Sequence, residues 1–119
     1  MTKQSFRQLF VLGLIISTWL FLKDLSDSTN GFNLPHADKV VHFVVFAGLS
    51  YILLNGFEHF PFVQVMFLSS YGFFIEYAQS YIPYRSASVG DLAADILGVL
   101  VVYSLRQQLK HKQKTDALI

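Results

Sequence analysis

The stretch from Val40 to Phe57 reads VVHFVVFAGLSYILLNGF and contains no Asp, Glu, Lys or Arg. Three further apolar stretches lie at about 6–22, 60–82 and 89–105. A helix needs roughly 20 mainly apolar residues to cross the hydrocarbon core of a bilayer. All four stretches have about that length, the first of them only if it begins near Phe6. The pattern therefore predicts an all-α membrane protein with four transmembrane helices.

The composition of the 119-residue chain agrees with a membrane location. Hydrophobic residues make up 53% and charged residues 14%, against about 25% charged in typical soluble domains. This balance excludes intrinsic disorder, and it disfavours a soluble protein because so small a body has little interior for apolar surface. The net charge of +1 offers no basic face to nucleic acid, and the lack of cysteine excludes disulfides and thiolate metal sites. One domain covering residues 1–119 is expected.

The basic residues predict the orientation of the four helices. Four spans place both termini on one side of the membrane. That side carries Lys3, Arg7, Arg106, Lys110, Lys112 and Lys114, whereas the opposite side carries only Lys23, Lys39 and Arg85. The positive-inside rule then places both termini in the cytoplasm. A cleaved signal peptide is disfavoured for the first stretch, because its apolar core is not followed by a small-x-small cleavage site.

With this orientation, we expect every strongly polar residue of the last three helices to lie near the outer leaflet. These residues are Lys39 and His42 at the start of the second helix, Glu76 and Gln79 at the end of the third, and Asp91 and Asp95 at the start of the fourth. Spacings of three or four residues put both members of each pair on one helix face. The three pairs are therefore expected at one depth.

The fourth helix also carries a stripe of small residues, Gly90, Ala94 and Gly98, which lets another helix approach closely. Asp91 and Asp95 flank this stripe, so they are expected to point into the bundle. Arg85 lies in the connector at the same end. We therefore expect one cluster, made of His42, Glu76, Arg85, Asp91 and Asp95.

Structural interpretations of these residues stay open. Asp91 at a helix start is also explained by the positive end of the helix macrodipole, with Ser88 as the N-cap. Glu76 is also explained by an ion pair with Arg85 or Lys39 that locks the bundle. Ionisable residues inside membrane spans are functional by default, which favours a functional site. Neither a metal nor a cofactor is predicted, because no HExxH or similar ligand spacing occurs.

An ordered set of short motifs resembles the VanZ-like family of bacterial membrane proteins. The motifs are K-x-x-H-F (Lys39 to Phe43), E-x-x-Q (Glu76 to Gln79), Arg85, and D-x-x-x-[DN]-x-x-G (Asp91 to Gly98). The resemblance covers residues 38–105 and leaves the first helix and the tail without a signature. It implies a small multi-pass protein of the bacterial cytoplasmic membrane, related to a namesake associated with resistance to the glycopeptide antibiotic teicoplanin.

The favoured function is a non-enzymatic envelope protein whose polar site binds the head group of an amphiphile. That amphiphile would be a lipid-linked envelope precursor, or a lipopeptide or glycopeptide antibiotic. Lys39 and Arg85 would contact phosphate, and the carboxylates and Gln79 would contact sugar or amide groups. The expected ligand-binding residues are Lys39, His42, Glu76, Gln79, Arg85, Ser88, Asp91 and Asp95.

The alternative function is a membrane enzyme that acts on a lipid head group. His42, Glu76, Asp91 and Asp95 are its catalytic candidates, for acid–base or metal-assisted chemistry. No nucleophile motif supports it, because Ser86 and Ser88 lack a G-x-S-x-G context. A proton-linked transporter is a third hypothesis, and it would need an oligomer. Membrane lipids are the expected partners, and oligomerisation is left open.

Overall fold

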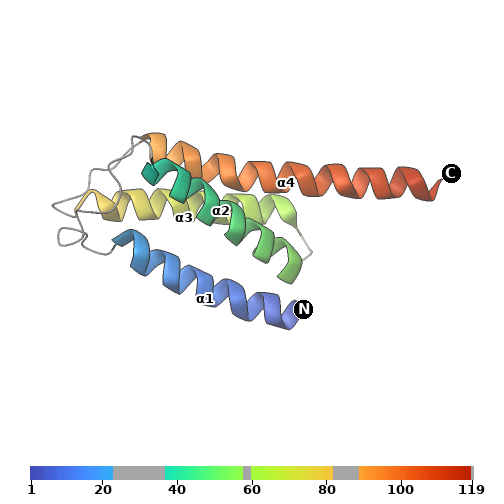
Figure 1. The fold of residues 1–119 in the computed structure, drawn as a ribbon, viewed down its shortest axis with the longest axis horizontal. Helices are drawn as coiled ribbons and strands as arrows, with labels where there is room; N and C mark the ends of the chain where they lie inside the picture. The colour runs from blue at the N-terminus through green and yellow to red at the C-terminus, as the bar shows by residue number, and fades with distance from the viewer. Residues whose placement is uncertain (23–36, 58–59, 82–88, 119) are drawn as a thin grey trace.

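A computed structural model describes residues 1–22, 37–57, 60–81 and 89–118 of the chain. They form four α-helices: α1 (Lys3–Leu22), α2 (Ala37–Gly56), α3 (Pro61–Gln79) and α4 (Val89–Ala117) (Figure 1). The prediction of an all-α protein is confirmed, with four helices in the described part. The main difference from the expected boundaries is that α4 continues beyond residue 105, through a tail whose Lys and Gln residues are good helix formers.

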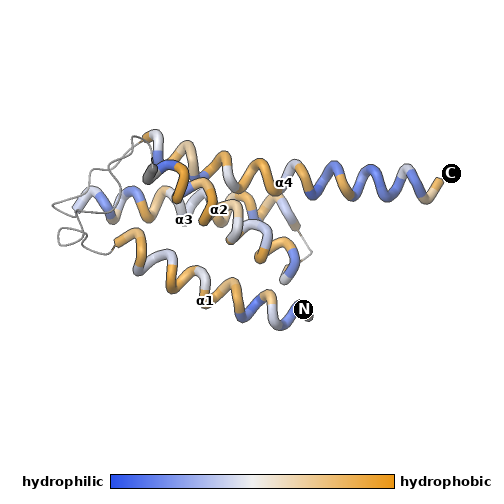
Figure 2. Tube along the Cα trace, in the orientation of Figure 1, coloured by the Kyte–Doolittle hydropathy of each residue, from blue (hydrophilic) through white to orange (hydrophobic). Residues whose placement is uncertain are grey.

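The four helices run alternately in opposite directions along a body of 57 × 28 × 24 Å (Figure 1). The start of α1 and the end of α4 therefore lie towards the same end of the molecule. We call this the terminal end, which also holds Gly56 and Pro61. The opposite end, which holds Leu22, Ala37, Gln79 and Val89, is called the distal end. The last turns of α4 extend beyond the other helices and are hydrophilic (Figure 2).

The backbones of α2 and α4 approach each other very closely at Gly98. A Cβ atom added to Gly98 would lie 2.6 Å from the carbonyl oxygen of Phe43 and 3.1 Å from the amide nitrogen of Ala47. Any residue other than glycine would therefore force the two helices apart. The small-residue stripe expected on the fourth helix thus includes a position of close helix contact, as in many membrane bundles.

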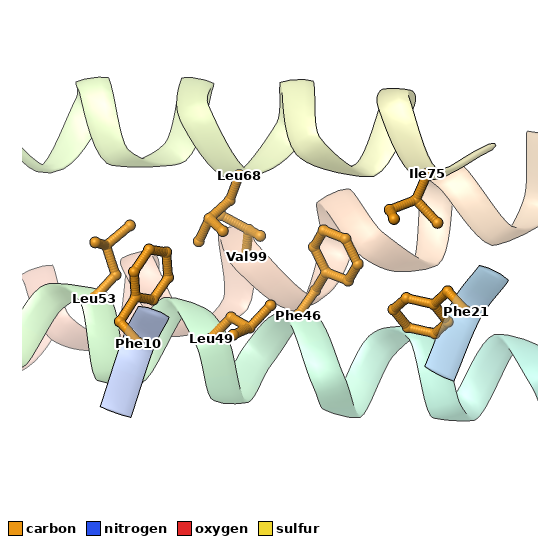
Figure 3. Close-up of a cluster of buried hydrophobic side chains, with 8 residues drawn as sticks. All are labelled: Phe10, Phe21, Phe46, Leu49, Leu53, Leu68, Ile75 and Val99. Atoms are coloured by element: carbon orange, nitrogen blue, oxygen red, sulfur yellow. The ribbon is translucent and has the colours of Figure 1, made fainter. Parts of the chain in front are cut away.

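A core of apolar side chains fills the space between the helices (Figure 3). Its eight buried members come from all four helices: Phe10, Phe21, Phe46, Leu49, Leu53, Leu68, Ile75 and Val99. Phe46 lies in the middle, with ring centroids 6.2 Å from Phe21 and 5.5 Å from Tyr71. Close packing of this kind supplies the dispersion contacts that hold helices together where water is absent.

The outer surface of the bundle is apolar over much of its length. Among the described residues, α1 and the part of α2 from Lys39 to Gly56 are long and apolar enough to cross a membrane. α3 contains the buried polar residues Gln64, Glu76 and Gln79, and α4 contains buried Asp91 and Asp95 and an exposed polar tail. Their outward faces nevertheless carry exposed Phe62, Phe67, Phe73, Leu97 and Leu105.

A second set of polar contacts lies at the terminal end and was not anticipated. Arg7 donates from Nε to the carbonyl oxygen of Gly56 at 2.8 Å, and Arg106 donates from Nη1 to Asn55 Oδ1 at 3.1 Å. Gln64, on the first turn of α3, is buried and donates from Nε2 to the carbonyl oxygen of Phe57. The expectation that all strongly polar residues of the last three helices lie at one end is therefore wrong. Arg7 and Gln64 thus satisfy backbone carbonyl groups at the end of α2, which need partners.

Candidate functional site

The helix starts and ends at the distal end bring polar side chains together. His42 lies in the second turn of α2, Glu76 in the last turn of α3, and Asp91 and Asp95 in the first two turns of α4. All four are buried, with 2% of the His42 side chain and none of the Asp95 side chain exposed. Together with Lys39, which is 34% exposed at its side chain, we call them the charged cluster.

His42 is the centre of the charged cluster. Its Nδ1 atom lies 2.8 Å from Asp95 Oδ1, a hydrogen bond between buried groups, and 3.9 Å from Glu76 Oε1. Its other ring nitrogen, Nε2, lies 3.8 Å from Asp91 Oδ2. Each of the three acids, from two different helices, therefore faces the imidazole. This arrangement holds the ring orientation through Asp95 and directs Nε2 towards Asp91.

Lys39 forms the exposed edge of the charged cluster. Its Nζ atom lies 3.4 Å from Asp91 Oδ1, so the two oxygens of Asp91 face Lys39 and His42 respectively. Of the two ion pairs considered for Glu76 from the sequence, the one with Lys39 is not seen in the described residues. Lys39 pairs with Asp91 instead.

Phe21 on α1 completes the surroundings of His42, and its role was not predicted from the sequence. Its ring stacks on the imidazole with centroids 4.4 Å apart and planes 21° apart. Its carbonyl oxygen accepts a hydrogen bond from Gln79 Nε2 at 2.9 Å. Gln79 is thus turned towards α1 and ties it to α3. The sequence shows a Phe in the last turn of the first helix. It does not show that the ring and the backbone oxygen of this residue contact polar side chains, because every Phe has these groups.

A glycine on α3 makes room for Asp95. A Cβ atom added to Gly72 would lie 3.1 Å from Asp95 Oδ2 and 3.2 Å from Asp95 Cβ. Gly72 is one helical turn before Glu76, so the two residues share the face of α3 that meets α4. Gly72 thus admits the Asp95 side chain beside α3, just as Gly98 admits the backbone of α2 beside α4.

A family model for VanZ/LLP1 proteins matches residues 2–109 of the chain. The chain belongs to the VanZ/LLP1 family. The match includes α1, which carries no residue of the motifs recognised in the sequence, and so assigns that helix to the family unit as well. Neither the curated proteins nor the solved structures give a significant match. Family membership supports an envelope- or antibiotic-resistance-related membrane protein.

Two predicted site residues of this VanZ/LLP1 chain, Arg85 and Ser88, lie outside the described residues, in the connector between α3 and α4. Of the remaining predicted residues, Lys39, His42, Glu76, Asp91 and Asp95 lie together in the charged cluster. Gln79 donates to the carbonyl oxygen of Phe21, whose ring stacks on His42.

A shallow, open apolar groove lies on the outer surface of this family member, along α1 and beside Tyr71 of α3. It has a volume of about 510 Å³ and is lined by Leu14, Ile15, Thr18, Trp19 and Tyr71. The hydroxyl of Tyr71 lies 2.6 Å from Thr18 Oγ1 and 2.9 Å from Ser17 Oγ, so its polar atom is satisfied within the bundle. Tyr71 contacts Phe46, which contacts Phe21 above His42. The groove and the charged cluster are therefore linked through three aromatic rings.

The charged cluster has the chemistry for three tasks. A cationic edge at Lys39 suits a phosphate or carboxylate group. The hydrogen-bonded Asp95 and His42 suit proton transfer. One nitrogen or oxygen atom from each of His42, Glu76 and Asp91 lies within 4.8 Å of the others, a grouping that suits a metal ion.

Proposed function

We propose that this VanZ/LLP1 protein binds the polar head group of an envelope amphiphile at the charged cluster. The amphiphile is a lipid-linked envelope precursor, or a lipopeptide or glycopeptide antibiotic. The observation that carries the proposal is the buried set of His42, Glu76, Asp91 and Asp95, with Lys39 at its exposed edge. Ionisable groups inside a membrane bundle are costly and are kept where they do work on a substrate, ion or proton.

The proposal includes four membrane spans with both termini in the cytoplasm. The exposed apolar side chains of α3 and α4 support it, because water would disfavour such a surface and lipid would not. The terminal end carries Arg7 and Arg106, in agreement with the positive-inside rule. The distal end, with the charged cluster, then lies at the outer boundary of a bacterial cytoplasmic membrane, where lipid head groups are.

The groove along α1 and beside Tyr71 is the proposed place for an acyl or isoprenoid chain. Its walls are mostly apolar, and it opens towards the surroundings of the bundle. Trp19, the single tryptophan of the chain, lies in its wall and is exposed. An amphiphile would thus place its charged group at Lys39 and its chain along Trp19.

A binding experiment with matched variants tests this function. The purified protein is titrated in nanodiscs of phosphatidylcholine with phosphatidic acid, whose head group is a phosphate monoester, and separately with teicoplanin. Tryptophan fluorescence with bromine-labelled acyl chains reports occupation of the groove. Lys39→Gln is expected to weaken the phosphatidic acid interaction by about tenfold or more, because a charge-assisted hydrogen bond contributes roughly 1.5–3 kcal/mol.

Lys110→Gln is the matched control, since it removes the same charge from the exposed tail of α4. It is expected to leave binding unchanged. Equal effects of the two variants would show that only net charge matters and would contradict a specific site. No saturable binding of either ligand by the wild-type protein would refute the head-group proposal.

The Asp95–His42 hydrogen bond specifically favours a second candidate function, an acid–base enzyme that acts on a lipid head group. A carboxylate on one imidazole nitrogen prepares the other nitrogen to accept a proton. In this function His42 is the general base, Asp95 orients it, and Glu76 and Asp91 are the remaining candidates for proton donors.

Conservative variants separate binding from catalysis. Glu76→Gln and Asp91→Asn keep side-chain size and much of the hydrogen bonding. For binding, we expect a graded loss of complementation when each variant is expressed in a deletion strain exposed to envelope antibiotics. For catalysis, one of the two variants should abolish complementation while the protein stays folded, because positioned proton transfer contributes about 10²–10⁴-fold. Turnover of an envelope lipid by purified protein would favour the enzyme.

A further inference from the structure

The orientation of His42 resembles that of a metal ligand. Its Nδ1 atom is held by Asp95 Oδ1 at 2.8 Å, which leaves Nε2 directed towards Asp91 Oδ2 at 3.8 Å. Histidines that bind metals generally donate their second ring N–H to a carboxylate or carbonyl group, which fixes the tautomer and the ring plane. Asp95 holds that outer position here, and it is completely buried.

Three donor residues from three helices lie close to one another. His42 on α2, Glu76 on α3 and Asp91 on α4 each offer one atom, and these atoms lie within 4.8 Å of one another. Around a tetrahedral zinc ion with ligands at about 2.0–2.2 Å, ligand atoms lie roughly 3.3–3.6 Å apart. Shifts of about 1 Å or less would therefore close the three donors around an ion. All three side chains are buried, so the ion would be shielded from bulk water.

Asp95 gives a second, independent indication. Its Oδ2 atom is buried and has no hydrogen-bond partner in the described part of the chain. This atom lies in the space that Gly72 leaves open, one turn from Glu76. Buried polar atoms without partners are uncommon and usually mark an ion, a water molecule or a functional role.

We propose that His42, Glu76 and Asp91 bind one divalent cation of the zinc class, and that Asp95 positions the imidazole. Imidazole nitrogen and carboxylate oxygen both bind Zn²⁺, and Zn²⁺ sites with three protein ligands keep a fourth position for an outside ligand. A phosphate oxygen of the head group takes this fourth position, and only this last step rests on the proposed function. From the sequence these residues are candidates for metal-assisted catalysis only, because ligands from three helices have no local spacing that predicts a metal site.

The test uses full-length protein in detergent, with any affinity tag removed and the metal stripped by a chelator. Isothermal titration with ZnCl₂, and separately with MnCl₂ and MgCl₂, is expected to show one Zn²⁺ per chain with micromolar or tighter affinity. Glu76→Gln is expected to weaken Zn²⁺ binding at least tenfold, and Asp95→Asn by about 10–100-fold, as for other outer partners of metal-binding histidines.

His111→Gln and Asp116→Asn are the controls, because both residues lie on the exposed tail of α4. They are expected to keep wild-type affinity. If they weaken Zn²⁺ binding as much as Glu76→Gln does, the ion is bound elsewhere and the proposal is wrong. Lack of Zn²⁺ binding by the wild-type protein, or a preference for Mg²⁺ over Zn²⁺, would also overturn it.

X-ray absorption of the Zn²⁺-loaded wild-type protein avoids any folding defect of a variant. The expected spectrum shows one imidazole and oxygen ligands at about 2.0–2.2 Å. More than one imidazole in the spectrum would contradict the site. Titration with phosphatidic acid in the presence of EDTA separates this proposal from the head-group function. If the protein binds the lipid but does not bind Zn²⁺, the head-group function stands and the metal site is wrong. If it binds Zn²⁺ but not the lipid, the metal site stands and the head-group function is wrong.

Discussion

Replacing Gly98 with Ala tests whether the approach of α2 to α4 builds the charged cluster. The added Cβ would lie 2.6 Å from the carbonyl oxygen of Phe43 and 3.1 Å from the amide nitrogen of Ala47. Favourable non-bonded contacts begin at about 3.5 Å, so the helices would have to separate by most of an ångström. Both neighbours are backbone atoms, which cannot rotate away as a flexible side chain can.

The expected cost follows from two opposing contributions. Overpacking of a tight contact typically costs about 1–3 kcal/mol, and the backbone clash places this case in the upper part of that range. The higher helix propensity of Ala returns about 1 kcal/mol. The clash outweighs the propensity, so a net destabilisation of roughly 1–2 kcal/mol is expected for Gly98→Ala.

Thermal unfolding of purified protein in one detergent measures the effect. For a chain of this size, we expect Gly98→Ala to lower Tm by roughly 3–12 °C, since 1 kcal/mol shifts Tm by about 4–8 °C in domains of 60–100 residues and by about 2–4 °C in domains of 150–250 residues. Gly48→Ala is the matched control on α2, because its added Cβ would meet nothing within 4 Å. It is expected to leave Tm unchanged or slightly higher. If Gly98→Ala is as stable as Gly48→Ala, the tight contact does not hold the two helices in place.

Two further predictions concern α1 and the orientation of the bundle. Phe21→Ala removes the ring stacked on His42, so we expect it to lower Tm clearly more than Phe73→Ala, because Phe73 is 62% exposed. Equal shifts in Tm would argue against a packing role for Phe21. A periplasm-dependent reporter inserted at residues 26–33 should be active and the same reporter after Leu105 inactive, because basic residues concentrate at the terminal end; the reverse result would refute the orientation.

The residues of the charged cluster could be predicted because the spacing of residues along a helix determines which face and which end of the helix they occupy. Asp91 and Asp95 are four residues apart, so they share a helix face. His42 lies near the start of the second helix, Glu76 near the end of the third, and the two aspartates near the start of the fourth. Successive helices of an antiparallel bundle run in opposite directions, so these three places lie at the same end. The part that could not be anticipated depends on distances between helices. The pairing of Asp95 with Nδ1 rather than Nε2 of His42 is one example.

The contributions of α1 and of the terminal end were missed for a different reason. Phe21 acts through its ring and its backbone oxygen, which any apolar helix also offers. Gln64 and Asn55 stand in apolar stretches where their amides look like exceptions, yet Gln64 donates to the carbonyl oxygen of Phe57 and Asn55 accepts from Arg106. A polar residue in an apolar helix can therefore belong to a functional site or hydrogen-bond a group near a helix end. Only the packing of the helices shows which of these two roles it has.

Burial assigns different tasks to the members of the charged cluster under the proposed function. Lys39 is the most exposed of them, so an incoming head group meets Lys39 and the nearby oxygen of Asp91 first. His42 and Asp95 lie deeper, beneath Phe21 and beside Gly72, where they hold the geometry of the inner donors. Substitution of Lys39 should then change the capture of an amphiphile and its dependence on salt. Substitution of Asp95 should instead change how tightly the inner donors hold their ligand, because a positioning carboxylate acts only through the imidazole that it orients.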